Sequence, residues 1–224
     1  MAAHGGHRGR RRPGRRRVDP LSRRARFIAL EGIDGAGKTT QLRLLAAALR
    51  RRGLDVETAR EPGGTALGER LREVLLQADG IHVAPAAEVL LFAAARAQLV
   101  AEVIRPALAA GRWVLCDRFV DSSLAYQGLG RGLGVDAVWE ANRVALAGCV
   151  PDRALVLDVP VGAARGRAAR EDRIETEGDS FQRAVADGYR ELAQRFPERV
   201  VLVPASGSVD EVHAAVMARV EDLL

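Results

Sequence analysis

Residues 32–39 read Gly-Ile-Asp-Gly-Ala-Gly-Lys-Thr, and no other feature of the chain constrains its fold as strongly. The run fits the pattern GxxxxGK[ST]. It lies between an apolar run at 26–31, typical of a buried strand, and a segment whose leucines recur at helical spacing. Glycines let the backbone curl so that successive N–H groups face phosphate oxygens, and the helix N-terminus adds a positive dipole end. The segment therefore predicts a loop that binds the phosphates of a nucleoside triphosphate.

The residues expected to contact the triphosphate are those of the loop and the first helical turn. They are Gly32, Ile33, Asp34, Gly35, Ala36, Gly37, Lys38, Thr39 and Thr40. In such loops the lysine bridges the β- and γ-phosphates, and the hydroxyl that follows it binds Mg²⁺. Lys38 is the single lysine in a chain with 33 arginines. A compact ammonium differs from a planar guanidinium, so the composition alone marks Lys38 as a site where arginine does not serve.

Charge divides the 224 residues into two parts. Residues 1–26 hold ten arginines and one acidic residue, whereas the rest of the chain carries a net charge of −4. We expect residues 1–24 to be a disordered extension, because a Gly/Arg/Pro-rich stretch buries too little apolar surface to order itself. Residues 25–224 are expected to form one domain. The basic extension is the only feature that favours a nucleic-acid partner.

The expected cellular location follows from features that the sequence lacks. No apolar run reaches the roughly 18 residues that a membrane span needs, and the N-terminal arginines precede no hydrophobic stretch typical of a secretory signal. The two cysteines, Cys116 and Cys149, do not make a disulfide framework. We therefore expect a cytoplasmic protein without membrane association.

The pattern of elements predicts an α/β fold. Five short runs typical of strands, each followed by a segment with helical features, indicate βαβ units and a five-stranded parallel sheet with helices on both faces. The glycine-rich stretch 117–134 is expected to be a loop, and an arginine-rich helix is expected after residue 159. The strands are expected at 26–31, 55–60, 112–116, 153–159 and 199–203, and the main helices at about 38–52, 67–75, 85–111, 135–146, 181–196 and from 209 onward.

Two aspartates compete for the role of a carboxylate that holds Mg²⁺ beside Thr39. Asp117 and Asp158 each end an apolar strand, and ligands of open α/β sheets bind where strands end. The pattern alone leaves both open. Arg118, next to Asp117, has the planar fork suited to bind a phosphate group with two hydrogen bonds.

Five further segments decide which class of P-loop protein the chain resembles. They are residues 60–64 (REPGG), 91–96 (LFAAAR), 117–119 (DRF), 123–128 (SLAYQG) and 172–175 (DRIE). Together with the P-loop they resemble the thymidylate kinase family, collinearly over about residues 26–224. The resemblance implies the P-loop nucleoside monophosphate kinase fold, transfer of the γ-phosphoryl group of ATP-Mg²⁺ to dTMP in dTTP synthesis, and a homodimer. It also favours Asp117 over Asp158 as the Mg²⁺-side carboxylate.

The resemblance further implies a role for each matching residue. Asp34 would accept a hydrogen bond from the 3′-hydroxyl of the acceptor sugar, and Arg118 would bind the acceptor phosphate. Phe92 would stack on the thymine ring while Arg96, four residues on along the same helix face, donates to its O4. Further members of the expected substrate site are Glu61, Pro62, Ser123, Tyr126 and Gln127. Of these, Ser123 and Tyr126 would read the base edge and crowd the sugar 2′ position, with Gln127 at the same wall.

The resemblance implies a catalytic arginine either in the P-loop or in a lid over ATP, and the lid is expected to supply it because the P-loop holds Gly35 and Ala36 and no arginine. The resemblance points to the segment with Arg165, Arg167 and Arg170, of which we favour Arg167 and then Arg170. Arg173 or a partner subunit would be the fallback.

Two other functions stay open at this point. One is a kinase for another nucleoside monophosphate or a deoxynucleoside. The other is a P-loop ATPase or GTPase that acts on nucleic acid. A guanine-reading NKxD motif is absent from the sequence, and the single lysine, at residue 38, already belongs to the P-loop.

Overall fold

A five-stranded parallel sheet forms the centre of the molecule. The computed structural model describes residues 24–76, 82–166, 173–174 and 177–224. The strands lie in the order β2-β3-β1-β4-β5, and every neighbouring pair is parallel. Their bounds are β1 Phe27–Glu31, β2 Val56–Arg60, β3 Trp113–Asp117, β4 Arg153–Asp158 and β5 Val200–Pro204. All five lie within one or two residues of the expected positions, so the predicted fold class is confirmed.

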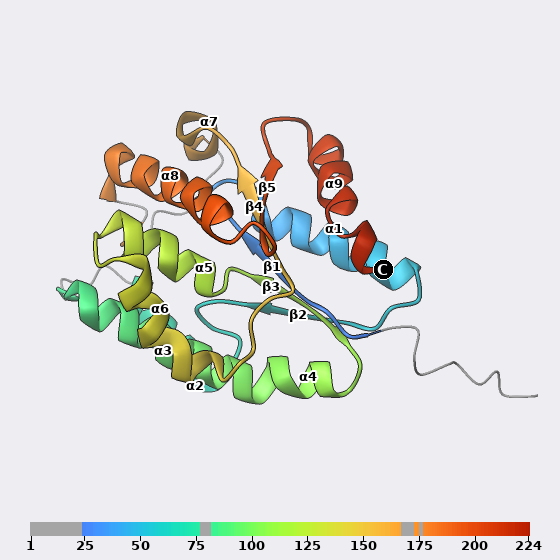
Figure 1. The fold of residues 1–224 in the computed structure, drawn as a ribbon, viewed down its shortest axis with the longest axis horizontal. Helices are drawn as coiled ribbons and strands as arrows, with labels where there is room; N and C mark the ends of the chain where they lie inside the picture. The colour runs from blue at the N-terminus through green and yellow to red at the C-terminus, as the bar shows by residue number, and fades with distance from the viewer. Residues whose placement is uncertain (1–23, 77–81, 167–172, 175–176) are drawn as a thin grey trace, which may run out of the picture.

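Helices cover both faces of this sheet (Figure 1). Helices α1 and α9 pack on each other and on one face. The other face carries the run from α3 to α4, together with α5, α6 and α8. The helix bounds are α1 Lys38–Arg51, α2 Ala66–Leu76, α3 Pro85–Leu99, η1 Val100–Ile104, α4 Arg105–Ala109, α5 Val120–Ser123, η2 Leu124–Gly130, α6 Val135–Leu146, α7 Val161–Arg165, α8 Asp179–Arg195, α9 Val209–Ala218 and η4 Glu221–Leu223.

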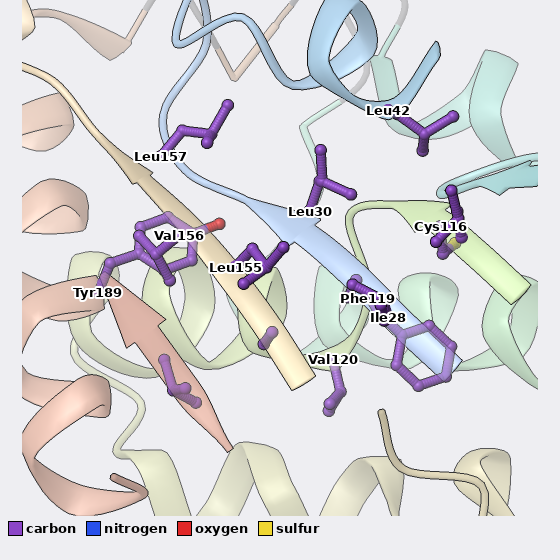
Figure 2. Close-up of a cluster of buried hydrophobic side chains, with 14 of the residues drawn as sticks. Ile28, Leu30, Leu42, Cys116, Phe119, Val120, Leu155, Val156, Leu157 and Tyr189 are labelled. Atoms are coloured by element: carbon purple, nitrogen blue, oxygen red, sulfur yellow. The ribbon is translucent and has the colours of Figure 1, made fainter. Parts of the chain in front are cut away.

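The core lies on both sides of the central strand. All five residues of β1 are buried, as are Val114, Leu115 and Cys116 of β3. Figure 2 shows side chains from β1, β3 and β4 gathered with Phe119 and Tyr189, which come from other elements. A strand buried on both faces reads as a continuous apolar run, which is why the sequence FIAL was recognisable as a strand. The one charged residue in that strand, Glu31, stands at its carboxyl end.

The expectation of a glycine-rich loop at 117–134 was wrong for most of that stretch. Residues 120–130 are helical, first as α5 and then as η2, a π-helix. Burial explains the difference, because Val120, Leu124, Ala125 and Tyr126 all belong to the core and α8 packs closely along η2. Tertiary packing here overrides the weak helix propensity of glycine.

The long helix expected at 85–111 is one helical run, divided by a π-helical turn. The segment η1 connects α3 to α4, directly before Pro106. Proline has no N–H to donate, so the regular hydrogen-bond ladder of the helix is interrupted at Pro106.

Some expectations fall outside the described residues. These include most of the extension at 1–24, the larger part of the arginine-rich segment after α7, and part of the DRIE run. None of the helices in the described part of the chain combines the length and the apolar content that crossing a bilayer requires.

Candidate functional site

The site lies in a crevice at the carboxyl ends of the strands. From β1 the chain passes to β2 and β3 on one side and then to β4 and β5 on the other, and open α/β sheets bind ligands where the strand order reverses in this way. A cavity of about 1200 Å³ opens there. It is lined by the P-loop, by the ends of β2 and β3, by α3 and by the loop after β5.

The P-loop adopts a backbone that its glycines permit. Gly32, Gly35 and Gly37 have φ angles of 131°, 76° and 95°, which side chains other than glycine rarely tolerate. A Cβ on Gly35 would also lie 2.0 Å from the carbonyl oxygen of Ala164. Helix α1 begins at Lys38, so its unpaired N–H groups and positive dipole end face the crevice.

Lys38 is held by the loop that it follows. Its Nζ donates to the carbonyl oxygens of Gly32 at 3.1 Å and Ile33 at 2.8 Å, and lies 3.9 Å from a carboxylate oxygen of Asp34. Burial, and the positive charge of Arg118 nearby, lower the pKa of Lys38 to about 8. Asp34 is its nearest carboxylate and is shared with Arg118, so a phosphate group would add negative charge where burial disfavours the ammonium form.

The structure brings Thr39 and Asp117 together and keeps Asp158 apart from them. The Thr39 hydroxyl donates to the Asp117 carboxylate at 2.6 Å. Asp158 instead accepts from Arg190 of α8, at 2.7 Å. The two strand-ending aspartates thus differ in a way that the sequence pattern did not reveal, and only Asp117 lies beside the P-loop hydroxyl.

Arg118 stands on a strained turn at the end of β3. Its φ of 67° lies in the left-handed region, which is uncommon for a residue with a side chain. Its N–H donates to Leu30 O at 2.9 Å, and its guanidinium donates to Gly32 O at 2.9 Å. The same guanidinium pairs with the Asp34 carboxylate and lies over the Tyr126 ring, 5.1 Å from its centroid.

Asp34 and Tyr126 complete this part of the wall. The Tyr126 hydroxyl donates to Asp34 Oδ2 at 3.1 Å. Burial alone would raise the pKa of Asp34, but the charges of Arg118 and Lys38 outweigh it and lower the pKa to about 2. Asp34 is therefore a stable anion whose oxygens accept from neighbours.

Behind Arg118 lies a polar group that the sequence analysis did not single out. Glu31 is fully buried, and it accepts from the N–H of Phe119 at 2.8 Å, from Ser122 Oγ at 2.6 Å and from the Tyr189 hydroxyl at 3.0 Å. Burial raises the pKa of Glu31 to about 7, and nearby Asp121 adds to this effect. The position of a carboxylate at the end of an apolar strand was a signal for Glu31. Ser122 and Tyr189 gave none.

The floor of the cavity is formed around Arg96, which is 1% exposed. Its guanidinium donates to Glu61 Oε2 at 2.9 and 2.6 Å, to Ser123 Oγ at 3.2 Å, to Phe119 O at 3.2 Å and to the side chain of Asn142 on α6. All the N–H groups of Arg96 thus have acceptors within the protein. The contacts to Ser123 Oγ and to Phe119 O are the longest, at 3.2 Å each, and Ser123 Oγ accepts from both terminal nitrogens.

Other expected substrate residues lie around this floor. Phe92 is half-buried and, like Pro62, lines the cavity. Gln127 also lines the cavity, but its amide donates to Glu88 at 2.8 Å. Burial raises the pKa of Glu61 to about 7, and Arg96 offsets part of that rise. The far end of the cavity, lined by Gln41, Ser208 and Val209, was not predicted.

The expected lid is only partly described. Helix α7 ends at Arg165, and Gly166 follows it. Arg167 and Arg170 lie outside the described residues, so the structure does not test either as the catalytic arginine. Arg173 donates to Glu88 at 2.6 Å and to Leu75 O at 3.0 Å.

Comparison with known proteins assigns the chain to a family. The model of the family described as thymidylate kinase matches residues 30–216. The chain belongs to the thymidylate kinase family. A thymidylate kinase of Pelotomaculum thermopropionicum is 50% identical over 205 residues, which cover 90% of this chain and 95% of that protein. One of Rhizorhabdus wittichii is 49% identical over 204 residues, with 89% and 98% covered.

The fold leads to the same family. The crystal structure of a thymidylate kinase from Ehrlichia chaffeensis matches with a TM-score of 0.73 at 32% identity, covering 88% of this chain and 98% of that one. The likeness covers 88–90% of this chain and at least 95% of each of these relatives, so it extends far beyond one shared motif.

Proposed function

We propose that this protein is a dTMP kinase, an enzyme that transfers the γ-phosphoryl group of ATP to dTMP and so makes dTDP. The proposal rests on one observation: in a chain of the thymidylate kinase family, a single crevice offers residues suited to a donor nucleotide and residues suited to an acceptor nucleotide. One end has the P-loop with Lys38 and Thr39, and the other has Phe92 and Arg96, with Asp34 and Arg118 also lining the cavity. A donor and an acceptor nucleotide would meet between these ends.

Each end would bind one phosphate group of the reaction. Lys38 would bind the β- and γ-phosphates, and Arg118 would bind the acceptor phosphate with its planar fork. The attacking oxygen belongs to a phosphate monoester, which is largely ionised at pH 7, so the reaction needs positioning more than a general base. Asp34 would accept from the sugar 3′-hydroxyl and would fix the acceptor relative to Arg118.

The residues present fit a Mg²⁺ ion. Thr39 and Asp117 offer two oxygen atoms of the kind that Mg²⁺ prefers, 2.6 Å apart. Within the described residues no group of three or more His, Cys, Asp or Glu side chains could hold a metal ion. Mg²⁺ in kinases needs no such cage, because phosphate oxygens and water complete its shell. When bound, the ion would neutralise phosphate charge, and Thr39 and Asp117 would hold it.

The base would be read at the cavity floor. Phe92 would stack on thymine, and one Arg96 N–H now shared with Ser123 would turn to O4, since Ser123 Oγ accepts from both terminal nitrogens of that guanidinium and could release one. Tyr126, held by Asp34 and Arg118, would crowd the sugar 2′ position. Glu61, Pro62 and Gln127 would complete the wall.

We further propose that the catalytic arginine belongs to the segment after α7. The P-loop offers none, so the lid would supply that cation, with Arg167 and then Arg170 as the candidates. An assay of Arg167→Ala and Arg170→Ala, with Arg165→Ala beside them, separates the three. The catalytic one should lose about 10²–10⁴-fold in kcat while ATP affinity changes little.

A homodimer is proposed as the assembly. Helices α2, α3 and α6 pack beside one another and carry exposed apolar side chains, among them Leu67, Leu90 and Val144 at 48%, 60% and 85% exposure. A second copy of the chain would cover them. Sedimentation of the protein and of Leu90→Arg tests this, with a monomeric wild type as the contrary result.

The experiment that tests the function is a coupled ADP-release assay with a panel of nucleoside monophosphates and deoxynucleosides. dTMP should be the best acceptor by kcat/KM. ADP release that is independent of any acceptor would instead favour a P-loop ATPase, and a better acceptor of another base would favour a related kinase.

A further inference from the structure

We propose that Glu31 is a positioning residue that fixes the turn carrying Arg118, and through it the acceptor phosphate site. The inference rests on the proposed function, in which Arg118 binds that phosphate. Glu31 touches neither the cavity nor Arg118 itself, since it is not among the residues that line the cavity and its three hydrogen bonds go elsewhere.

The turn at Arg118 needs stabilising contacts from other elements, because its backbone is strained. Arg118 has a φ of 67°, and such a conformation in a residue with a side chain persists only when its surroundings determine it. The two N–H groups at the turn are fixed by β1 alone. Arg118 N–H donates to Leu30 O, and the next one, of Phe119, donates to Glu31 Oε1 at 2.8 Å.

The other oxygen of Glu31 organises the surroundings of the guanidinium. Oε2 accepts from Ser122 at 2.6 Å and from Tyr189 at 3.0 Å, and these two hydroxyls lie 2.9 Å from each other. Arg118 Nη1 in turn lies 3.1 Å from Ser122 Oγ and 3.4 Å from the Tyr189 hydroxyl. The carboxylate therefore orients the two hydroxyl oxygens so that their lone pairs face Arg118.

These hydrogen bonds explain how the protein tolerates the Glu31 carboxylate, whose charge is costly to bury. A fully buried carboxylate without a direct cationic partner is rare, and its cost must be offset by hydrogen bonds. Glu31 joins β1, the turn after β3 and helix α8, three elements far apart in the chain. Tyr189, shown in Figure 2 among the buried side chains around the sheet, is the contribution of α8.

The test compares Glu31→Ala, Glu31→Gln and a matched control, Asp152→Asn. Asp152 also accepts a backbone N–H of β1, that of Phe27 at 2.8 Å, but at the opposite end of the strand. For each variant we would measure kcat, the KM for dTMP, the Kd for ATP by calorimetry, and the melting temperature.

Glu31→Ala should lose about 10²-fold in kcat/KM for dTMP, because the phosphate-binding guanidinium is displaced. The Kd for ATP should stay within about twofold, since the Lys38 contacts do not involve Glu31. Glu31→Gln should recover to within about tenfold of wild type, because an amide can still accept from Phe119 and donate to both hydroxyls, although more weakly. Asp152→Asn should keep wild-type kinetics.

Three results would overturn the proposal. They are an unchanged kcat/KM for dTMP in Glu31→Ala, a parallel loss of ATP and dTMP binding, and a Glu31→Gln enzyme no better than the alanine variant. If Glu31→Ala fails to fold, the glutamine variant alone decides. Its kcat/KM for dTMP should then fall while its Kd for ATP stays near that of the wild type. Failure of the proposed function is a separate result, because the wild-type protein would then not phosphorylate dTMP at all.

Discussion

Replacing Lys38 by arginine keeps the charge and changes only its shape, which makes it a sharp test of the P-loop. The ammonium sits against two carbonyl oxygens, at 2.8 and 3.1 Å, and is 7% exposed. A guanidinium is larger and planar, so it has to extend into the cavity where the phosphates would lie. We expect kcat to fall about 10²–10³-fold, the usual effect of losing one well-placed donor to transition-state charge.

The stability of this variant should change little, because the two carbonyl acceptors can still be satisfied by an arginine and the extra atoms enter open space. Turnover in the coupled assay and the melting temperature would both be measured. Arg43→Lys, on the exposed face of the same helix, is the matched control and should behave as wild type. A Lys38→Arg enzyme that retains more than about a third of wild-type kcat would refute the role given to Lys38.

Three further predictions follow from the site and the sequence. Selectivity for dTMP over dUMP should be about 10–200-fold at most, because one methyl group decides it, and selectivity over dCMP should be larger because Arg96 would face an amino group. Equal kcat/KM for dCMP and dTMP would show that Arg96 does not recognise the base. Asp34→Asn should lower the free energy of unfolding by about 2 kcal/mol at pH 7, since the folded-state pKa of about 2 lies below the ordinary 3.8. That difference should shrink as pH falls from about 4 towards 2, where the carboxylate takes up its proton, and urea unfolding that shows it growing instead would be contrary. Deleting residues 1–24 should leave kcat and the melting temperature nearly unchanged, because the segment has little apolar content to dock. A loss of several degrees would show that it packs on the domain.

Local patterns predicted much of this fold. Four of the five strands could be found because each is a short apolar run, and the expectation that a strand-ending aspartate lies beside Thr39 followed from the rule that ligands bind at strand ends. Which strand-ending aspartate lies beside Thr39 could not be derived, since that depends on sheet order, and the pairing of Asp158 with Arg190 leaves no trace in the pattern.

What the sequence could not predict depends on contacts between distant residues. Glu31 and Tyr189 are separated by 158 positions and meet only because α8 packs along η2. Asn142, 46 positions from Arg96, gave no signal that it would hold the guanidinium. The helical conformation of residues 120–130 was missed for the same reason, because burial between elements and not propensity decides it.

The proposed phosphorylation of dTMP is tested most directly by following the γ-phosphoryl group of ATP. The purified protein would be incubated with [γ-³²P]ATP, MgCl₂ and dTMP, and the products would be separated. A dTMP kinase should place the label in dTDP, at a rate that depends on dTMP and far exceeds label release as inorganic phosphate. Label found only in inorganic phosphate, or transferred to another monophosphate in preference to dTMP, would contradict it.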